Sequence, residues 1–221
     1  MGFGFDIWEA AASLFFPPRC PLCRKTVETR GAWCRDCLTD ASRGELVHLP
    51  DLSVWVLGRY RGGLRRSIRS LKYQGKRAEL PGMLTFIHAQ EKQLHLTSNV
   101  LAVPVPLHAK RERERGFNQV ELIFGPWLEE RGIEFHRALT RREETRPMYR
   151  LSPKERRENL TGAFSCPDPG PVRGRPILLL DDILTSGATL GACARTLREA
   201  GSGPVTGLVL ASDYTGKRVL K

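Results

Sequence analysis

Two adjacent carboxylates, Asp181 and Asp182, lie near the end of an apolar run and precede a loop of small and hydroxyl-bearing residues in Ile177–Thr189, which reads ILLLDDILTSGAT. Ligands of open α/β sheets bind at the carboxyl ends of the strands, where this pattern places both acids. The loop then enters a helix N-terminus, whose free N–H groups and partial positive charge favour phosphate. We therefore expect an anion site directly beside two acidic side chains.

The residue types in this loop suit a sugar phosphate. Thr185, Ser186 and Thr189 supply hydroxyl donors, and Gly187 allows the backbone to approach a ligand closely. Carboxylates only accept hydrogen bonds, so they would repel a phosphate but hold two vicinal sugar hydroxyls. The loop lacks the lysine of a nucleoside-triphosphate P-loop. Ribose 5-phosphate has the required shape, and the alternative is a structural helix cap beside one solvated acid.

Cysteines form a second chemical cluster. Four of the six cysteines make two C-x-x-C pairs ten residues apart, which are Cys20, Cys23, Cys34 and Cys37. Tetrahedral Zn²⁺ takes four such thiolates at about 2.3 Å. We predict a zinc ribbon with strands at Thr26–Thr29 and Ala32–Trp33 and a turn at Gly31. The alternatives are two disulfides, which would require a secreted chain, or a redox pair. Cys193, in a helical stretch, is expected to be a core thiol.

Composition limits the remaining possibilities. The 221 residues carry a net charge of +11, which favours anionic partners such as phosphate-rich small molecules, nucleic acid or a membrane surface. Apolar residues make up 41% of the chain, enough for a real core, but no apolar run approaches the ~18 residues that span a bilayer. Residues 1–18 are apolar without a basic n-region, which predicts an amphipathic helix ending before Pro17 rather than a signal peptide. We therefore expect a cytoplasmic protein.

Apolar strands without alternation, separated by helices, predict a parallel sheet covered on both faces. The predicted strands are Asp51–Leu57, Val100–Val105, Ile133–Leu139, Pro176–Ile183 and Val205–Ala211. The predicted helices are Leu64–Lys72, Leu80–Gln93, Gln119–Glu130 and Thr189–Ala200, with another beginning at Ser152. We divide the chain into a helix and zinc ribbon over residues 1–48 and an α/β domain over residues 49–221.

Several stretches carry a resemblance to known families. Ile177–Thr189 resembles the 5-phosphoribosyl-1-pyrophosphate (PRPP) motif of type I phosphoribosyltransferases at nearly every position. CPLC with CRDC, YRGGLRRSIRSLKYQGKR, VPVPLH, RERGFNQ and LSPKERRENLTGAF together resemble the ComF family of competence-associated proteins, from about Leu14 to Ala211. The resemblance implies a type I phosphoribosyltransferase-like parallel sheet with helices on both faces, plus a zinc ribbon, linked to DNA uptake. One departure is Met148, where family members usually have Gln.

The resemblance also implies roles for individual residues. Asp181 and Asp182 would hold the ribose hydroxyls, Thr185–Thr189 the 5′-phosphate, and the turn after Val103–Pro106 would resemble the pyrophosphate loop. Lys110–Gln119 would be a mobile lid, and Mg²⁺ would be held mainly by the substrate's own oxygens. The PRPP-binding residues so expected are Asp181, Asp182, Thr185, Ser186, Gly187, Ala188, Thr189, Val105 and Pro106.

Phosphoribosyl transfer would also need cations for the departing pyrophosphate. Arg59–Arg77 holds eight basic side chains and no acid. From this strip and the lid we select as catalytic candidates Lys72, Lys76, Arg111 and Arg115. His108, beside the lid, could act as an acid or base or be a solvated surface residue.

The acceptor stays open, because no base-recognition segment of a purine or pyrimidine enzyme stands out. The expected function is therefore a phosphoribosyltransferase-like protein, and the alternative is a non-catalytic PRPP sensor or a single-stranded-DNA-binding module that meets DNA-uptake proteins. The outward arginines Arg65, Arg66 and Arg69 would then contact phosphates or be merely solvated. Three aromatic side chains could stack on bases or pack in the core, which are Trp33, Tyr60 and Tyr73.

Overall fold

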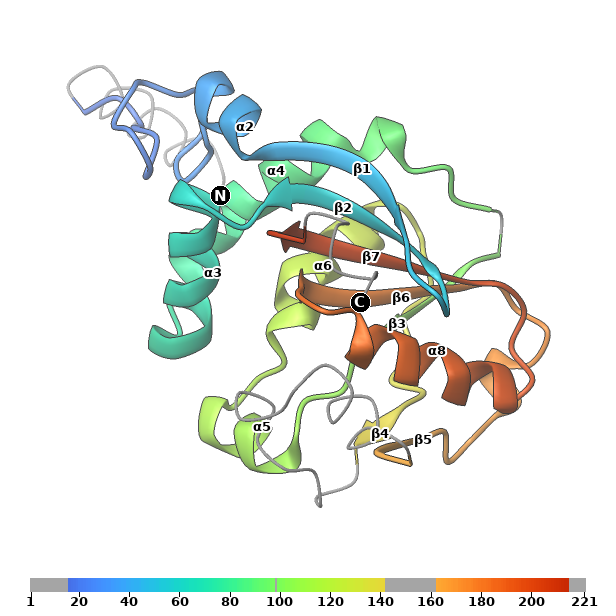
Figure 1. The fold of residues 1–221 in the computed structure, drawn as a ribbon. Coiled ribbons are helices and arrows are strands. Elements are labelled where there is room, and N and C mark those ends of the chain that lie inside the picture. Colours follow the sequence, from blue (N-terminus) through green and yellow to red (C-terminus); the bar gives the residue numbers. More distant parts are fainter. Residues whose placement is uncertain (1–15, 98, 142–161, 215–221) are drawn as a thin grey trace, which may run out of the picture.

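A computed structural model describes residues 16–97, 99–141 and 162–214 of the chain. A five-stranded sheet has the order β1-β2-β7-β6-β3 (Figure 1). Its strands are β1 (Ser42–His48), β2 (Ser53–Arg59), β3 (Leu101–Pro104), β6 (Ile177–Leu184) and β7 (Val205–Ser212). Strands β2, β7, β6 and β3 are parallel, whereas β1 runs antiparallel along β2. A separate two-stranded ribbon pairs β4 (Thr140–Arg141) with β5 (Phe164–Ser165).

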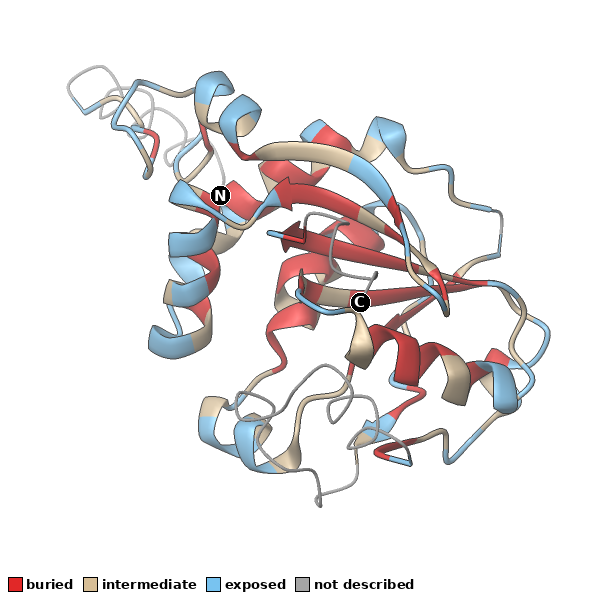
Figure 2. Ribbon diagram, viewed as in Figure 1, coloured by how far each residue is buried: buried red, intermediate tan, exposed pale blue. Residues whose placement is uncertain are grey.

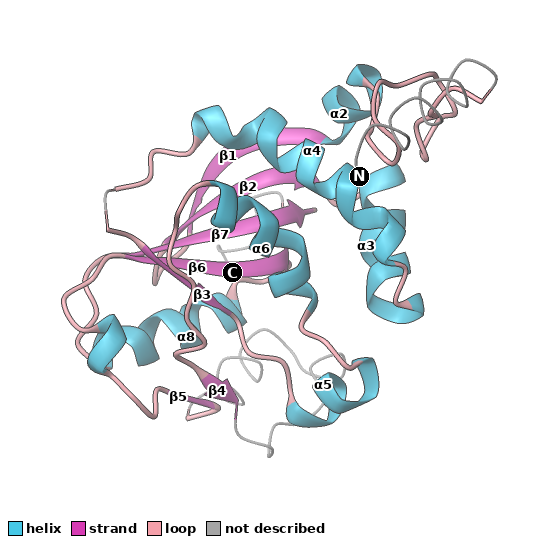
Figure 3. Ribbon diagram, turned by 180° about the vertical axis from the view of Figure 1, so that it is seen from behind, coloured by secondary structure: helices cyan, strands magenta, loops and turns pink. Residues whose placement is uncertain are grey.

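Helices cover both faces of the sheet. They are α2 (Arg35–Ala41), α3 (Gly62–Gln74), α4 (Leu80–Gln90), α5 (Ala109–Arg115), α6 (Gln119–Glu130) and α8 (Ala188–Glu199). Short 3₁₀ turns are Arg77–Glu79, Glu91–Gln93 and Gly170–Val172. Helix α8 lies on one face, and α4 and α6 lie on the other, as Figures 1 and 3 show from opposite sides. The predicted class, an α/β fold with a largely parallel sheet between helices, is confirmed.

Apolar spacing explains why these elements pack as they do. Leu64, Ile68 and Leu71 repeat along one stripe of α3 and are fully buried. Ile177–Leu180 of β6 are buried on both faces of the strand, and the central strands are buried along most of their length (Figure 2). Alternate residues of β6 supply two separate cores, one beneath α8 and one beneath α3, α4 and α6.

β6 runs through both acids to Leu184, one residue beyond the end of the predicted strand Pro176–Ile183. Two other local predictions were wrong. Ile133–Leu139 makes a single parallel bridge from Phe135 to Ala102, because only Glu134 and His136 exchange backbone hydrogen bonds with Ala102. The cysteine segment is not a two-stranded hairpin of the expected bounds. It has one bridge, between Arg19 and Thr26, and its second C-x-x-C opens α2.

Other features fall outside the predictions or the described residues. β1 was not predicted, because its polar sequence SRGELVH lacks an apolar period and a bulge interrupts it between Ser42 and Glu45. It precedes the proposed boundary at residue 48, yet it pairs with β2 in the main sheet. The helix expected within residues 1–16, the helix expected from Ser152 and Met148 lie outside the described residues. Among the described helices, none has the length and apolar character needed to cross a bilayer.

Candidate sugar-phosphate site and cysteine cluster

The two acids of β6 have different neighbours. Asp182 is 4% exposed, and its Oδ2 lies 2.5 Å from Nζ of Lys72 on α3. Asp181 is less buried, and its Oδ1 accepts a hydrogen bond of 2.8 Å from the Asp182 backbone N–H. Burial, and after it the charge of Asp181, raise the pKa of Cys193, which lies on α8. The acids therefore face opposite sides of the strand, with Asp182 toward α3 and Asp181 toward α8.

The surroundings of the Asp181 carboxyl favour its neutral form. Burial and the neighbouring charge of Asp182 raise the pKa of Asp181 from 3.8 to about 8, against the lowering effects of Lys72 and the Asp182 N–H. The Asp181 carboxyl is therefore protonated over much of the neutral range unless a ligand or cation joins it.

Arg141 of β4 is a residue that sequence reasoning missed. Burial lowers the pKa of its guanidinium, Arg111 lowers it further and Asp181 raises it, so Arg141 interacts electrostatically with both Arg111 and Asp181. The guanidinium also lies 5.6 Å from the ring centroid of Phe164. An arginine in the run TRREE gives no sequence signal, and only the fold brings Arg141 into electrostatic contact with Asp181 and the predicted Arg111.

The loop after the acids has the shape expected of an anion site. Gly187 caps α8 at φ +75°, a left-handed conformation that favours glycine. The side chain of Leu49 also lies only 2.5 Å from where a Cβ of Gly187 would be. Ser186 Oγ accepts a hydrogen bond of 3.4 Å from the Ala188 N–H, and Thr185 and Ser186 are exposed. The loop therefore presents hydroxyls at the open N-terminus of a twelve-residue helix.

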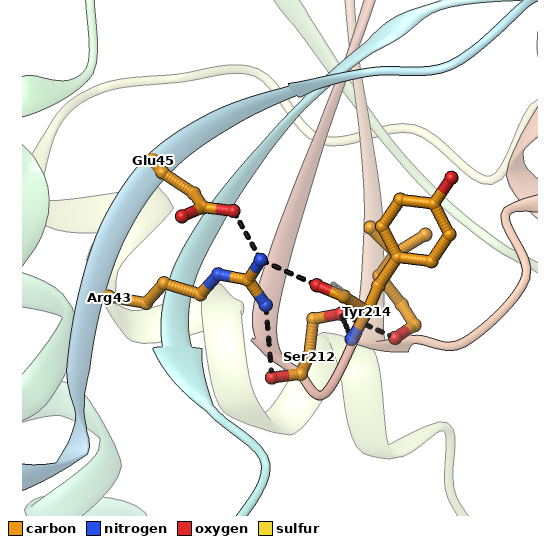
Figure 4. Close-up of polar contacts among 5 residues, drawn as sticks. Arg43, Glu45, Ser212 and Tyr214 are labelled. Atoms are coloured by element: carbon orange, nitrogen blue, oxygen red, sulfur yellow. Dashed lines mark hydrogen bonds and ion pairs between the residues drawn. The ribbon is translucent and has the colours of Figure 1, made fainter. Parts of the chain in front are cut away.

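A polar network fixes the strand ends beside this loop (Figure 4). Ser212 Oγ donates to the Leu184 carbonyl at 2.7 Å and accepts from the Tyr214 N–H at 2.9 Å. Arg43 of β1 donates to the Ser212 carbonyl at 3.4 Å and to the Tyr214 carbonyl at 2.5 Å, and it pairs with Glu45. Strand β1, which was not predicted, thus anchors the end of β7 through Arg43. Ser212 of β7 in turn holds Leu184, the last residue of β6 before the loop.

The residues expected near the pyrophosphate are largely engaged in structural contacts. The Val105 N–H donates to Leu180 O at 2.8 Å, and Val105 O accepts from Asn118 Nδ2 at 3.4 Å. Pro106 has no N–H. His108 caps α5, its Nδ1 accepting from the Lys110 N–H at 3.2 Å, so in this structure it serves as a helix cap. Part of the expected lid, Lys110–Gln119, is the helix α5 and the first residue of α6.

The four catalytic candidates do not converge on one point. Lys72 contacts Asp182, and Arg111 acts electrostatically on Arg141 near Asp181. Arg115 instead lies 5.7 Å from the ring centroid of Tyr73 and donates to Gln119 Oε1 at 2.6 Å. Lys76 is exposed, directly after the C-cap Gly75 of α3.

The outer face of α3 combines cations with aromatic rings. Arg65 lies 5.7 Å from the ring centroid of Tyr60, and Arg69 lies 5.3 Å from that of Tyr73. Tyr73 is 68% exposed. An open groove of about 490 Å³ is lined by Gly62, Arg65, Arg66, Arg69, Ser70, Tyr73 and Gln74. Trp33, the third proposed aromatic, is instead a core residue, 3% exposed and 5.7 Å from Phe86.

The cysteine cluster fits a metal. The Sγ atoms of the four predicted ligands, Cys20, Cys23, Cys34 and Cys37, all lie within 4.8 Å of one another. Four thiolates around Zn²⁺ at about 2.3 Å would be about 3.8 Å apart, so small adjustments suffice. Burial opposes ionisation of Cys20, but backbone N–H groups of Cys34, Cys23 and Leu22 outweigh it and lower the pKa of Cys20 to about 7. Burial and the neighbouring thiols instead raise the pKa of Cys37, so the case for structural Zn²⁺ rests on the clustering of the four sulfurs.

Small residues let the cysteine segment dock on the main domain. A Cβ on Gly82 of α4 would lie 2.1 Å from Trp33 Nε1, and one on Gly63 of α3 would lie 2.5 Å from Leu22. Arg61 of the β2–α3 turn pairs with Asp40 of α2 at 3.0 Å. The cysteine segment therefore packs against the N-terminal end of α3, and Lys72 lies near the C-terminal end of the same helix.

Several known proteins are similar to this chain. A family model described as "Double zinc ribbon domain" matches residues 11–45. The "DNA utilization protein YhgH" of Salmonella typhimurium is 28% identical over 84% of this chain and 86% of its own length. The "Competence protein ComFC" of Bacillus subtilis is 28% identical over 82% of this chain and 72% of its own length. These matches support the ComF resemblance that the sequence motifs carry.

Among solved structures, a hypoxanthine-guanine phosphoribosyltransferase (HGPRT) from Leishmania tarentolae in complex with GMP is 20% identical, covering 63% of this chain and 67% of that chain at a TM-score of 0.32. So low a score adds no argument of its own. The observed strand order, the helices on both faces and the cysteine cluster agree with the phosphoribosyltransferase-like domain and zinc ribbon predicted for a ComF protein.

Proposed function

We propose that this protein binds PRPP or ribose 5-phosphate, with Mg²⁺, at the end of β6 and serves DNA uptake as a phosphoribosyltransferase-like protein. The observation that carries the proposal is the order of groups along the chain: acids at the strand end, then the hydroxyl loop with left-handed Gly187, then the N-terminus of α8. The loop would hold the 5′-phosphate, and Asp181, on the same side of the strand, would accept a ribose hydroxyl.

Asp182 is less available than Asp181 for contact with the ribose. Its buried carboxylate is already neutralised by Lys72, so contact with a second hydroxyl would require the lysine to share it. Within the part of the chain that the structure describes, neither acid belongs to a group of three or more potential metal ligands, so Mg²⁺ would be held mainly by the oxygens of the substrate.

Transfer would break the bond from C1 to the pyrophosphate oxygen, which leaves with the electron pair, while an acceptor forms the new bond to C1 and loses a proton. The protein's task is to stabilise charge on the leaving group and to exclude water. Arg141 and Lys72 interact electrostatically with Asp181, Arg111 acts on Arg141, and Lys72 also contacts Asp182. Lys76 and Arg115 would have to approach from the edge of the site.

Calorimetry tests the ligand. We expect ribose 5-phosphate with Mg²⁺ to bind the wild type and to lose at least about tenfold in affinity in Asp181→Asn, which removes a charged acceptor. Asp168→Asn, an exposed acid away from β6, is the matched control and should bind normally. Unchanged affinity in Asp181→Asn would move the site elsewhere. Pyrophosphate release from PRPP, screened with bases, amines and nucleic acids, separates a transferase from a sensor.

A second function is favoured by the groove on α3. Its three arginines and exposed Tyr73 combine phosphate contacts with a stacking surface, which is how proteins hold single-stranded DNA. The names of the Salmonella and Bacillus relatives refer to DNA utilization and competence. Binding should weaken with salt at a log–log slope of roughly −0.7 per neutralised phosphate.

Charge reversal tests this surface. Arg65→Glu, Arg66→Glu and Arg69→Glu together should abolish single-stranded DNA binding and leave ribose 5-phosphate binding intact. Arg198→Glu, near the far end of α8, is the control. Equal loss in both variants would assign the effect to overall charge rather than to this groove.

A further inference from the structure

Helix α5, which holds most of the predicted lid cations, has little to hold it in place. None of its residues, Ala109–Arg115, is buried. Glu112 pairs with Arg137 at 3.5 Å across a surface that is largely solvated. The most specific contact at its C-terminal end is Arg115, which stacks on Tyr73 of α3 and is oriented by Gln119. The position of α5 therefore depends on a ring supplied by another helix.

The residue before Tyr73 is Lys72, whose ammonium group contacts Asp182 in the sugar-phosphate site. Consecutive residues of a helix project about 100° apart. The last turn of α3 therefore directs Lys72 toward the acid pair and the next residue, Tyr73, toward α5. This turn is also the last of the helix, because Gly75 ends it at φ +62°. A shift at Asp182 would thus move the ring on which Arg115 stacks.

We propose that Tyr73 is a positioning residue that docks α5 on α3, and that Lys72 couples this docking to occupancy of the acid pair. The second part rests on the proposed function, because it requires a ligand at Asp181 and Asp182. When ligand hydroxyls or a cation share Asp182, the ammonium of Lys72 moves, the last turn of α3 adjusts, and the docking of α5 changes with it.

Hydrogen–deuterium exchange of the full-length protein tests the docking without any ligand. Loss of one exposed cation–π contact should speed exchange of the amides in residues 109–116 about two- to fivefold in Tyr73→Leu. Tyr73→Phe keeps a ring and should stay close to wild type. Tyr60→Leu is the matched control, since Tyr60 also lies against an arginine of α3, Arg65. Equal exchange of residues 109–116 in Tyr73→Leu and Tyr60→Leu would overturn the docking.

The coupling has its own readout. Ribose 5-phosphate with Mg²⁺ should change exchange of residues 109–116 in the wild type, and the change should disappear in Tyr73→Leu although calorimetry still detects binding. Tyr73→Phe, which keeps the ring, should respond to the ligand as the wild type does. An unchanged response in Tyr73→Leu would overturn the coupling. If calorimetry finds no binding to wild type, the proposed function fails, while the ligand-free comparison still decides the role of Tyr73.

Discussion

Lys72 and Asp182 form an ion pair of 2.5 Å between α3 and β6, with side-chain exposures of 15% and 5%. The pair joins the basic strip to the acid motif, two features that are far apart in the sequence. Because both charges are largely withdrawn from water, each needs the other, and removing one leaves a buried charge without compensation. This pair therefore affects stability as well as ligand binding.

Lys72→Met should lower the free energy of unfolding by about 3 kcal/mol near neutral pH, because Asp182 then lacks a counter-charge. Urea denaturation measures the loss. Combining it with Asp182→Asn should recover most of the stability, since no buried charge remains. A double variant no more stable than Lys72→Met would show that the pair contributes little.

Asp181 should make stability depend on pH in a defined direction. Its native pKa is raised from 3.8 to about 8, so the folded state binds this proton more tightly and stability falls as pH rises through that range. Asp181→Asn removes the titration. Its advantage over wild type should be absent near pH 4 and reach at least about 1.4 kcal/mol, the equivalent of one pKa unit, by pH 9. Thermal melts across pH measure this, and a difference independent of pH would contradict it.

Elemental analysis should find about one Zn²⁺ per chain, lost in Cys37→Ser and retained in Cys166→Ser, whose thiol lies outside the cluster. Removing the metal with a chelator should expose Trp33, because the cysteine segment presses this side chain against Gly82. Tryptophan emission should then shift to longer wavelength, and the shift should be smaller in Trp33→Phe. Metal-free wild-type protein with unchanged emission would contradict a structural zinc site.

Gly187→Ala should cost more stability than its left-handed backbone alone explains. The matched control is Gly132→Ala, at φ +62° with nothing within 4 Å of the added Cβ, which should cost about 1 kcal/mol. At Gly187 the Cβ would also meet Leu49, so a loss of about 2 kcal/mol is expected. Adding Leu49→Ala should reduce the loss specific to Gly187. Equal losses at both glycines would exclude the Leu49 contact, and urea denaturation measures all four proteins.

Periodic and local features could be predicted from the sequence. The stripe of Leu64, Ile68 and Leu71 predicted α3, and the helix predicted at Gln119–Glu130 has the observed bounds of α6. The four clustered thiols were predicted by their spacing alone. These features succeed because each depends on neighbours within a few residues, where side-chain order dictates geometry.

Other features required distant segments to meet. The polar strand β1 forms because β2 offers an edge, and its Arg43 then reaches the carbonyls of Ser212 and Tyr214. The end of β6 also differs slightly from the prediction, since pairing of Leu184 with Ser212 of β7 carries the strand one residue past Ile183. No local pattern contains such partners.

The order of amino acids alone shows which chemical groups the protein carries: an acid pair before a hydroxyl loop, four clustered thiols and a strip of cations. Their pairing becomes visible only in the folded chain. In the fold, Asp182 faces Lys72 and Asp181 faces α8. Arg141 interacts electrostatically with Asp181, and Arg115 makes a cation–π contact with Tyr73. The physical reason is that charge and stacking interactions act over a few ångströms in space regardless of distance along the chain, so their partners exist only after the helices have packed on the sheet.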